Sequence, residues 1–162
     1  MGSGEPGVSE GPRGRPPGDT ERARSVATAA QSCEPTNKEV IEAAYGSFAT
    51  GDVPAVLGVM DPKIKWTEAE GWPLYDGTFV GPQAVIDGVS LRVGEIGDNF
   101  SVNVAQLVAD GDTVVALGTY SWNTKGSGAP AEVKIAHVWT LDGGKVVRFE
   151  QHVDTARGRE LI

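Results

Sequence analysis

A short stretch from Lys63 to Glu68 combines an acidic side chain with large apolar ones. Its sequence, KIKWTE, alternates polar and apolar residues, which is typical of a strand with one buried face. On such a strand Ile64, Trp66 and Glu68 share that face. An isolated carboxylate is costly to bury, so one in this position is paired, has a raised pKa, or performs chemistry. Glu68 is therefore the first candidate for a general base.

A histidine lies on a later apolar strand. In AEVKIAHVWTL, residues 131–141, every second residue is apolar except His137, so this imidazole is expected to point inward. The last strand, KVVRFEQHV, carries His152 and is followed by Asp154. Neither of its faces is decisively apolar, and a bulge at the Gly143–Gly144 turn could reset which side faces in. Two histidines and scattered acids lack metal-ligand spacing, so no metal site is expected.

The elements that must position these residues begin with helices. The motif TNKE at 36–39 is a capping box, and it starts a helix that Gly51 ends. Asp52 caps a second short helix that reaches Met60, and a third is expected over about residues 82–94. Between the second and third helices, a Gly-, Pro- and aromatic-rich loop over residues 69–81 would cover the mouth of a pocket.

After residue 99 the pattern changes to strands. Four β-rich runs are separated by the short turns DGD, KGSG and DGG, which predicts an antiparallel meander. Helices first and a sheet afterwards indicate an α+β fold, with the helices covering one face of the sheet.

Composition separates a tail from this domain. Residues 1–35 are rich in Gly, Pro, Arg and Ser, so we expect a disordered N-terminal tail before a domain over residues 36–162. The formal net charge of −8 argues against nucleic acid and anionic membrane surfaces as partners. No apolar run has the roughly 18 residues of a membrane span. A single cysteine excludes a disulfide framework and is compatible with a cytoplasmic location.

Three segments resemble a known family. They are AAYGSFATGDVPAVLGVMDPKIKWTE, YDGTFVGPQAV and HVWTLDGGKVVRFEQHVDTA, and they look like ketosteroid-isomerase-related, SnoaL-like proteins of the nuclear transport factor 2-like superfamily. The resemblance covers about residues 36–162. It implies a cone-shaped, curved antiparallel sheet wrapped around three N-terminal helices, with a pocket at the open end. It also implies a homodimer formed through the convex face of the sheet.

The resemblance suggests roles for individual residues. Glu68 falls where ketosteroid isomerases have a general-base aspartate, and His137 falls where they have an oxyanion-site carboxylic acid. His152 falls near the acid/base aspartate of SnoaL-like cyclases, with Asp154 two residues on, and Tyr45 is at or next to the place of a helix tyrosine. The flat apolar side chains expected to bind a ring-containing ligand are Trp66, Trp72, Trp122 and Trp139.

These residues predict acid–base chemistry without a cofactor. The preferred function is an isomerase-, cyclase- or lyase-type enzyme acting on a small hydrophobic carbonyl or polyketide-like compound. Two alternatives stay open: an epoxide-hydrolase-like hydrolase, and a non-catalytic small-molecule-binding or dimerisation module. Each candidate also has a structural interpretation, such as an ion pair of Glu68 with a buried histidine or with Arg148.

Overall fold

The computed structural model describes residues 34–162. The predicted disordered tail, residues 1–35, therefore lies outside the described residues except for its last two. The elements follow in the order α1 (Asn37–Thr50), α2 (Val53–Gly58), β1 (Met60–Glu68), β2 (Gly77–Val80), α3 (Pro82–Gly88), the 3-10 helix η1 (Ser90–Arg92), α4 (Val93–Ile96), β3 (Asp98–Asp110), β4 (Thr113–Asn123), β5 (Pro130–Asp142), β6 (Lys145–Val153) and α5 (Thr155–Leu161).

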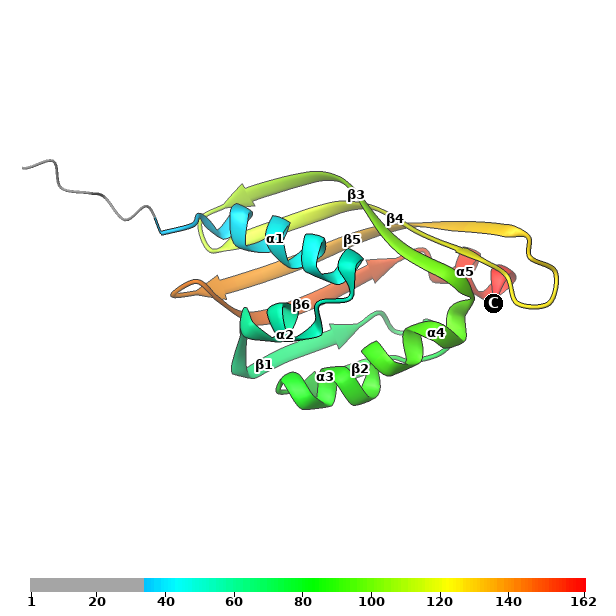
Figure 1. The fold of residues 1–162 in the computed structure, drawn as a ribbon, viewed down its shortest axis with the longest axis horizontal. Coiled ribbons are helices and arrows are strands. Elements are labelled where there is room, and N and C mark those ends of the chain that lie inside the picture. Colours follow the sequence, from blue (N-terminus) through cyan, green and yellow to red (C-terminus); the bar gives the residue numbers. More distant parts are fainter. Residues whose placement is uncertain (1–33) are drawn as a thin grey trace, which may run out of the picture. The chain divides into compact units, whose positions relative to one another are not determined.

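The strands form one curved, open sheet with the order β2-β1-β6-β5-β4-β3. Strands β3 to β6 make the predicted antiparallel meander, and β2 pairs antiparallel with β1. The one parallel pairing among the strands of the described residues joins β1 to β6, which brings the first strand beside the last one. Helix α1 packs on β3 and β4, and Figure 1 shows α1 and α2 on the same side of the sheet. The predicted α+β class is confirmed.

A bulge helps the sheet to curve. The register of β3 against β4 shifts between Val104 and Gln106, so one strand carries an extra residue there. Gly118 lies opposite Val104, and a Cβ atom at this position would collide with the carbonyl oxygen of Asn103. The close approach of the two backbones requires glycine at this point. Together the bulge and the glycine bend the outer strands over α1.

The helix ends follow local sequence chemistry. The Thr36 hydroxyl accepts a hydrogen bond from the backbone N–H of Glu39, and the Glu39 carboxylate accepts one from the backbone N–H of Thr36. Gly51 ends α1 in the left-handed conformation, as predicted. Asp52 caps α2, but this helix ends at Gly58, so the extension to Met60 was wrong. Met60 instead begins β1 and is buried.

The region after β1 differs more from expectation. The predicted third helix is divided into α3, η1 and α4, because helical geometry breaks at Val89. The predicted loop over residues 69–81 contains the short strand β2. Helix α5 was not predicted; it begins where Asp154 accepts a hydrogen bond from the backbone N–H of Arg157. No helix in residues 34–162 is long and apolar enough to cross a bilayer.

Helix α5 holds the loop between β1 and β2. The Arg159 Nε–H group donates to the backbone carbonyl of Gly71 at 3.0 Å. Gly158 packs against the ring of Trp72, which is buried. These two contacts fix the loop that also carries Tyr75.

Candidate functional site

A cavity of ≈ 90 Å³ lies between the helices and the inner face of the sheet. Its wall is largely aromatic, with Tyr45 and Phe48 from α1, Trp66 from β1, Tyr75 from the β1–β2 loop, Phe100 from β3, Tyr120 from β4, Trp139 from β5 and Phe149 from β6. Glu68 is the one acidic side chain among the residues that line it in the described part of the chain. The lining suits a hydrophobic ligand that meets a single carboxyl group, and the volume is smaller than the about 300–1,000 Å³ of pockets that hold drug-sized ligands.

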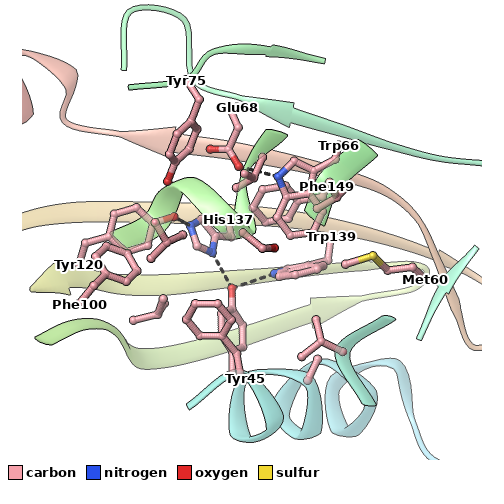
Figure 2. Close-up of a pocket in the computed structure, with 18 residues that line it drawn as sticks. Tyr45, Met60, Trp66, Glu68, Tyr75, Phe100, Tyr120, His137, Trp139 and Phe149 are labelled. Atoms are coloured by element: carbon pink, nitrogen blue, oxygen red, sulfur yellow. Dashed lines mark hydrogen bonds between the residues drawn. The ribbon is translucent and has the colours of Figure 1, made fainter. Parts of the chain in front are cut away.

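Glu68 is the last residue of β1, and its side chain faces the interior. It is only 3% exposed. Its Oε1 atom accepts a hydrogen bond from the Nε1–H group of Trp66 at 2.5 Å (Figure 2). Its Oε2 atom is buried and has no hydrogen-bond partner within residues 34–162. One carboxyl oxygen is thus held in place while the other is free to act on a ligand.

The environment of Glu68 favours its protonated form more than water does. Burial raises the pKa of the carboxyl to about 7, and the N–H groups of Trp66 and, to a lesser extent, Gln151 partly oppose this shift. Both protonation states are therefore populated near neutral pH, as a residue that takes up and releases a proton requires.

His137 lies on β5 between two tyrosines. The Tyr45 hydroxyl is 2.7 Å from Nδ1, and the Tyr120 hydroxyl is 2.8 Å from Nε2. Burial, with a smaller contribution from the nearby His152, lowers the pKa of this imidazole to about 3. His137 is therefore neutral, with both ring nitrogens already engaged. We call the side chains of Tyr45, His137 and Tyr120 the relay.

Two further side chains anchor the ends of the relay. The Nε1–H group of Trp139 donates to the Tyr45 hydroxyl at 3.0 Å, and the Nε2–H group of Gln151 donates to the Tyr120 hydroxyl at the same distance. The amide oxygen of Gln151 accepts from the backbone N–H of Ala69 at 3.1 Å. Gln151 therefore connects the relay with the chain directly after Glu68.

Five predicted site residues do line the cavity: Tyr45, Trp66, Glu68, His137 and Trp139. The predicted inward face of β5 and the shared face of Ile64, Trp66 and Glu68 are both confirmed by burial. The structure changes the expected part of His137, however. Because both its nitrogens bond to tyrosines, it has no free nitrogen to offer a ligand.

The predicted site roles of His152 and Asp154 were wrong, since the structure places both side chains outside the cavity. The register of β5 against β6 shifts between Thr140 and Leu141. The inward positions on β6 are therefore Val146, Phe149 and Gln151, and His152 is exposed. Asp154 is exposed and serves as the N-cap of α5.

The prediction that all four tryptophans bind a ligand was also wrong for two of them. Trp72, expected to bind a ligand, is buried beneath α5 at Gly158. Trp122 is buried beside Gly97 in the core. Neither ring lines the cavity. Each packs instead against a glycine, whose missing side chain leaves room for the indole.

Sequence reasoning missed Tyr75, Tyr120 and Gln151. Alternation along β4 could have found Tyr120, which shares its face with Val114, Ala116 and Trp122. Gln151 required knowledge of the bulge inside β6, where Val147 is the extra residue, and Tyr75 lies in a loop whose path no periodic pattern describes.

Comparison with known proteins agrees with this architecture. A family model described as the SnoaL-like domain matches residues 41–149. The chain belongs to the SnoaL-like family. A search of curated proteins gives no match. A family of this kind includes polyketide cyclases and isomerases.

Solved structures similar to this SnoaL-like protein share its fold over most of their length. An NTF2-like protein from Burkholderia thailandensis is 32% identical, with a TM-score of 0.73, and the match covers 79% of this chain and 98% of that one. TerC, co-crystallized with polyporic acid, is 29% identical, with a TM-score of 0.69 and coverage of 77% and 96%. A putative SnoaL-like polyketide cyclase from Jannaschia is 18% identical, with a TM-score of 0.66 and coverage of 78% and 90%, and it shows the fold alone.

Proposed function

We propose that this protein catalyses proton transfer on a small hydrophobic carbonyl or polyketide-like compound bound in the cavity, without a cofactor. The observation that carries the proposal is the free Oε2 atom of Glu68, buried in an aromatic cavity and belonging to a carboxyl whose pKa is raised to about 7. A buried, strongly perturbed acid in a cleft is typical of catalytic sites.

The ionised Glu68 would act as the base. Its Oε2 atom takes a proton from the carbon next to the substrate carbonyl, and the electron pair of the broken C–H bond moves to the carbonyl oxygen as an enolate. The same carboxyl then returns the proton to another carbon, which gives an isomer. Alternatively, the enolate carbon attacks a second carbonyl carbon of the same molecule and closes a ring, the π electron pair of that carbonyl moves to its oxygen, and this oxygen takes the proton from Glu68. A hydroxyl of the relay stabilises the negative oxygen.

The apolar wall supports this assignment. Trp66 and Phe149 stack with ring centroids 3.7 Å apart, and Trp139 packs edge-on against both. Such a surface excludes water, which strengthens hydrogen bonds to a developing charge. TerC, a similar protein co-crystallized with polyporic acid, supplies a compound with which to begin the search.

The hydrolase alternative has less support. Opening an epoxide requires one group to activate water and a second acid to protonate the leaving oxygen. Glu68 is the one carboxyl group that lines the cavity within residues 34–162, so the second role would fall to a tyrosine. Burial raises the pKa of both Tyr45 and Tyr120, which makes them weak acids.

The test is a thermal-shift screen followed by turnover assays. Wild type, Glu68→Gln and Glu70→Gln are compared with polyporic acid, an enone steroid and a styrene-type epoxide. Glu70 is exposed and two residues from Glu68, so it is the matched control. We expect a carbonyl compound to raise the melting temperature of all three variants and to be converted by wild type and Glu70→Gln only.

Other outcomes would redirect the assignment. Conversion of the epoxide alone would select the hydrolase. Binding without turnover of any bound compound would select the non-catalytic binding module. Equal turnover by Glu68→Gln and wild type would remove Glu68 from the mechanism.

A further inference from the structure

The relay has more protons than hydrogen bonds. With His137 neutral, Trp139, Tyr45, His137, Tyr120 and the Nε2 group of Gln151 each bring one proton to it, which makes five. Four hydrogen bonds join these five groups. One proton is therefore left without an acceptor inside the relay.

The tautomer of His137 decides where this proton lies. If Nε2 carries the ring proton, it donates to the Tyr120 hydroxyl oxygen, and Tyr45 must donate its own proton to the bare Nδ1. The hydroxyl proton of Tyr120 is then free. If Nδ1 carries the ring proton, the roles reverse and the hydroxyl proton of Tyr45 is free.

Neither hydroxyl has another acceptor in the described part of the chain. The hydrogen bonds of Tyr45 are those to Trp139 and His137, and the hydrogen bonds of Tyr120 are those to Gln151 and His137. Both tyrosines line the cavity, as does Glu68, whose free Oε2 is an acceptor without a donor. In the view of Figure 2 the ring of His137 is drawn between the hydroxyl of Tyr45 and the carboxyl of Glu68.

We infer that the relay offers the cavity one neutral hydroxyl donor, whose position, at Tyr45 or at Tyr120, is set by the tautomer of His137. His137 is thus a positioning residue: it touches no ligand, and it selects which tyrosine does. A ligand oxygen that accepts from one tyrosine fixes the tautomer, and the bound ligand keeps it fixed.

The inference rests on the proposed function and narrows its substrate. The relay presents one donor and Glu68 presents one carboxyl oxygen, both without partners, and Tyr75 also lines the cavity. The site therefore matches a ring compound with an acceptor oxygen and an acidic C–H or O–H close to it, such as an enolisable ketone or a hydroxy-substituted quinone or phenol.

The test is nitrogen NMR of the imidazole, with para-nitrophenolate as the probe. The chain has two histidines, so the His152→Gln variant leaves His137 as the source of the imidazole signals. A ring nitrogen without a proton resonates far from one that carries a proton, so the spectrum reports the tautomer. Glu68→Gln is added to remove the charge that would repel the phenolate at about pH 8, where the carboxyl is largely ionised.

Without probe, we expect one protonated and one bare nitrogen from about pH 5 to pH 8. With saturating probe, we expect the ratio of the two tautomers to change at least about tenfold, which corresponds to about 1.4 kcal/mol. A control with both Tyr45→Phe and Tyr120→Phe should show no change in that ratio on addition of probe.

The outcomes separate this inference from the proposed function. Two protonated nitrogens in the free protein would overturn the proton count whatever binds. Probe binding without a tautomer change would overturn the selection of the donor while leaving the cavity as a ligand site. If polyporic acid is converted but the probe does not bind and the spectrum stays unchanged, the free hydroxyl does not donate to a phenolate oxygen. This result too would overturn the inference.

Discussion

Trp66 and Glu68 are joined by a hydrogen bond of 2.5 Å between indole Nε1–H and carboxyl Oε1, on one face of β1. The bond orients the carboxyl so that its second oxygen is the one left free. It also stabilises the ionised form, and it therefore keeps the pKa of Glu68 below the value that burial alone would produce.

Replacing this donor should raise the pKa of Glu68 above about 7. In Trp66→Phe the apolar wall remains while the hydrogen bond to the carboxylate is lost. We expect the pH at which activity or ligand binding is half-maximal to move upward, measured as a pH–rate or pH–affinity profile. Trp122→Phe removes an indole that does not line the cavity, and it should leave the profile unchanged. An unshifted midpoint in Trp66→Phe would contradict the role of this bond.

The stability of the protein should fall as Glu68 ionises. Its pKa is raised from 4.5 to about 7, so the folded state binds more protons than the unfolded state between these values. The stabilising contribution of Glu68 therefore decreases as the pH rises through this window, by about 3 kcal/mol at most, while His137 acts in the opposite direction below about pH 6.5. The difference between wild type and Glu68→Gln in urea denaturation at about pH 5 and about pH 8 measures this contribution. Glu68→Gln should lose most of it and Glu70→Gln should keep it; equal pH dependence in all three proteins would argue against the raised pKa.

His137 should make the protein sensitive to acid. Its pKa is lowered from 6.5 to about 3, so between these pH values the imidazole is protonated in the unfolded state and neutral in the folded state. Stability is therefore lost as the pH falls from about 6.5 towards about 3, at about 1.4 kcal/mol per pH unit. Denaturation curves of wild type and His137→Gln should differ in this slope. His152→Gln is the control, and a wild-type slope in His137→Gln would contradict the prediction.

Gly158 should tolerate no side chain. A Cβ atom there would lie 2.5 Å from the ring of Trp72, in a tightly packed contact. Gly158→Ala should therefore destabilise the protein by about 1–3 kcal/mol and change the fluorescence of Trp72, because α5 must move away from the loop. Gly46→Ala is a control of opposite sign: it lies in α1 with open space around it, so it should stabilise by about 0.5–1 kcal/mol. Equal stability of the two variants would show that α5 does not press on the loop.

We propose a homodimer formed through the outer face of the sheet. Leu117 on β4 is 39% exposed and pairs with Ala136 on β5, so an apolar strip lies on the side opposite to the cavity. Leu117→Lys should convert a dimer to a monomer in light scattering coupled to size exclusion. Lys134→Ala alters an exposed β5 position and serves as the control. A monomeric wild type would refute the proposal.

Local sequence was sufficient for much of the fold. The capping box at Thr36, the glycine at residue 51 and the Asp52 cap depend on contacts within a few residues, and all three occur as predicted. The alternation in β1 and β5 likewise placed Glu68 and His137 inside, since side chains of a strand alternate between its faces whatever the strand pairs with. The resemblance to the SnoaL-like family followed from the order of these segments and is confirmed.

Tertiary structure decided the chemistry of the site. The bulge between β5 and β6 turned Gln151 inward and His152 outward, because one extra residue reverses the faces of everything after it. The partners of His137 come from α1 and β4, 92 and 17 residues away along the chain, and no local pattern encodes that meeting. The sequence by itself determined that an acid and an imidazole would be buried. Long-range packing determined that the acid keeps a free oxygen while the imidazole lies between two tyrosines.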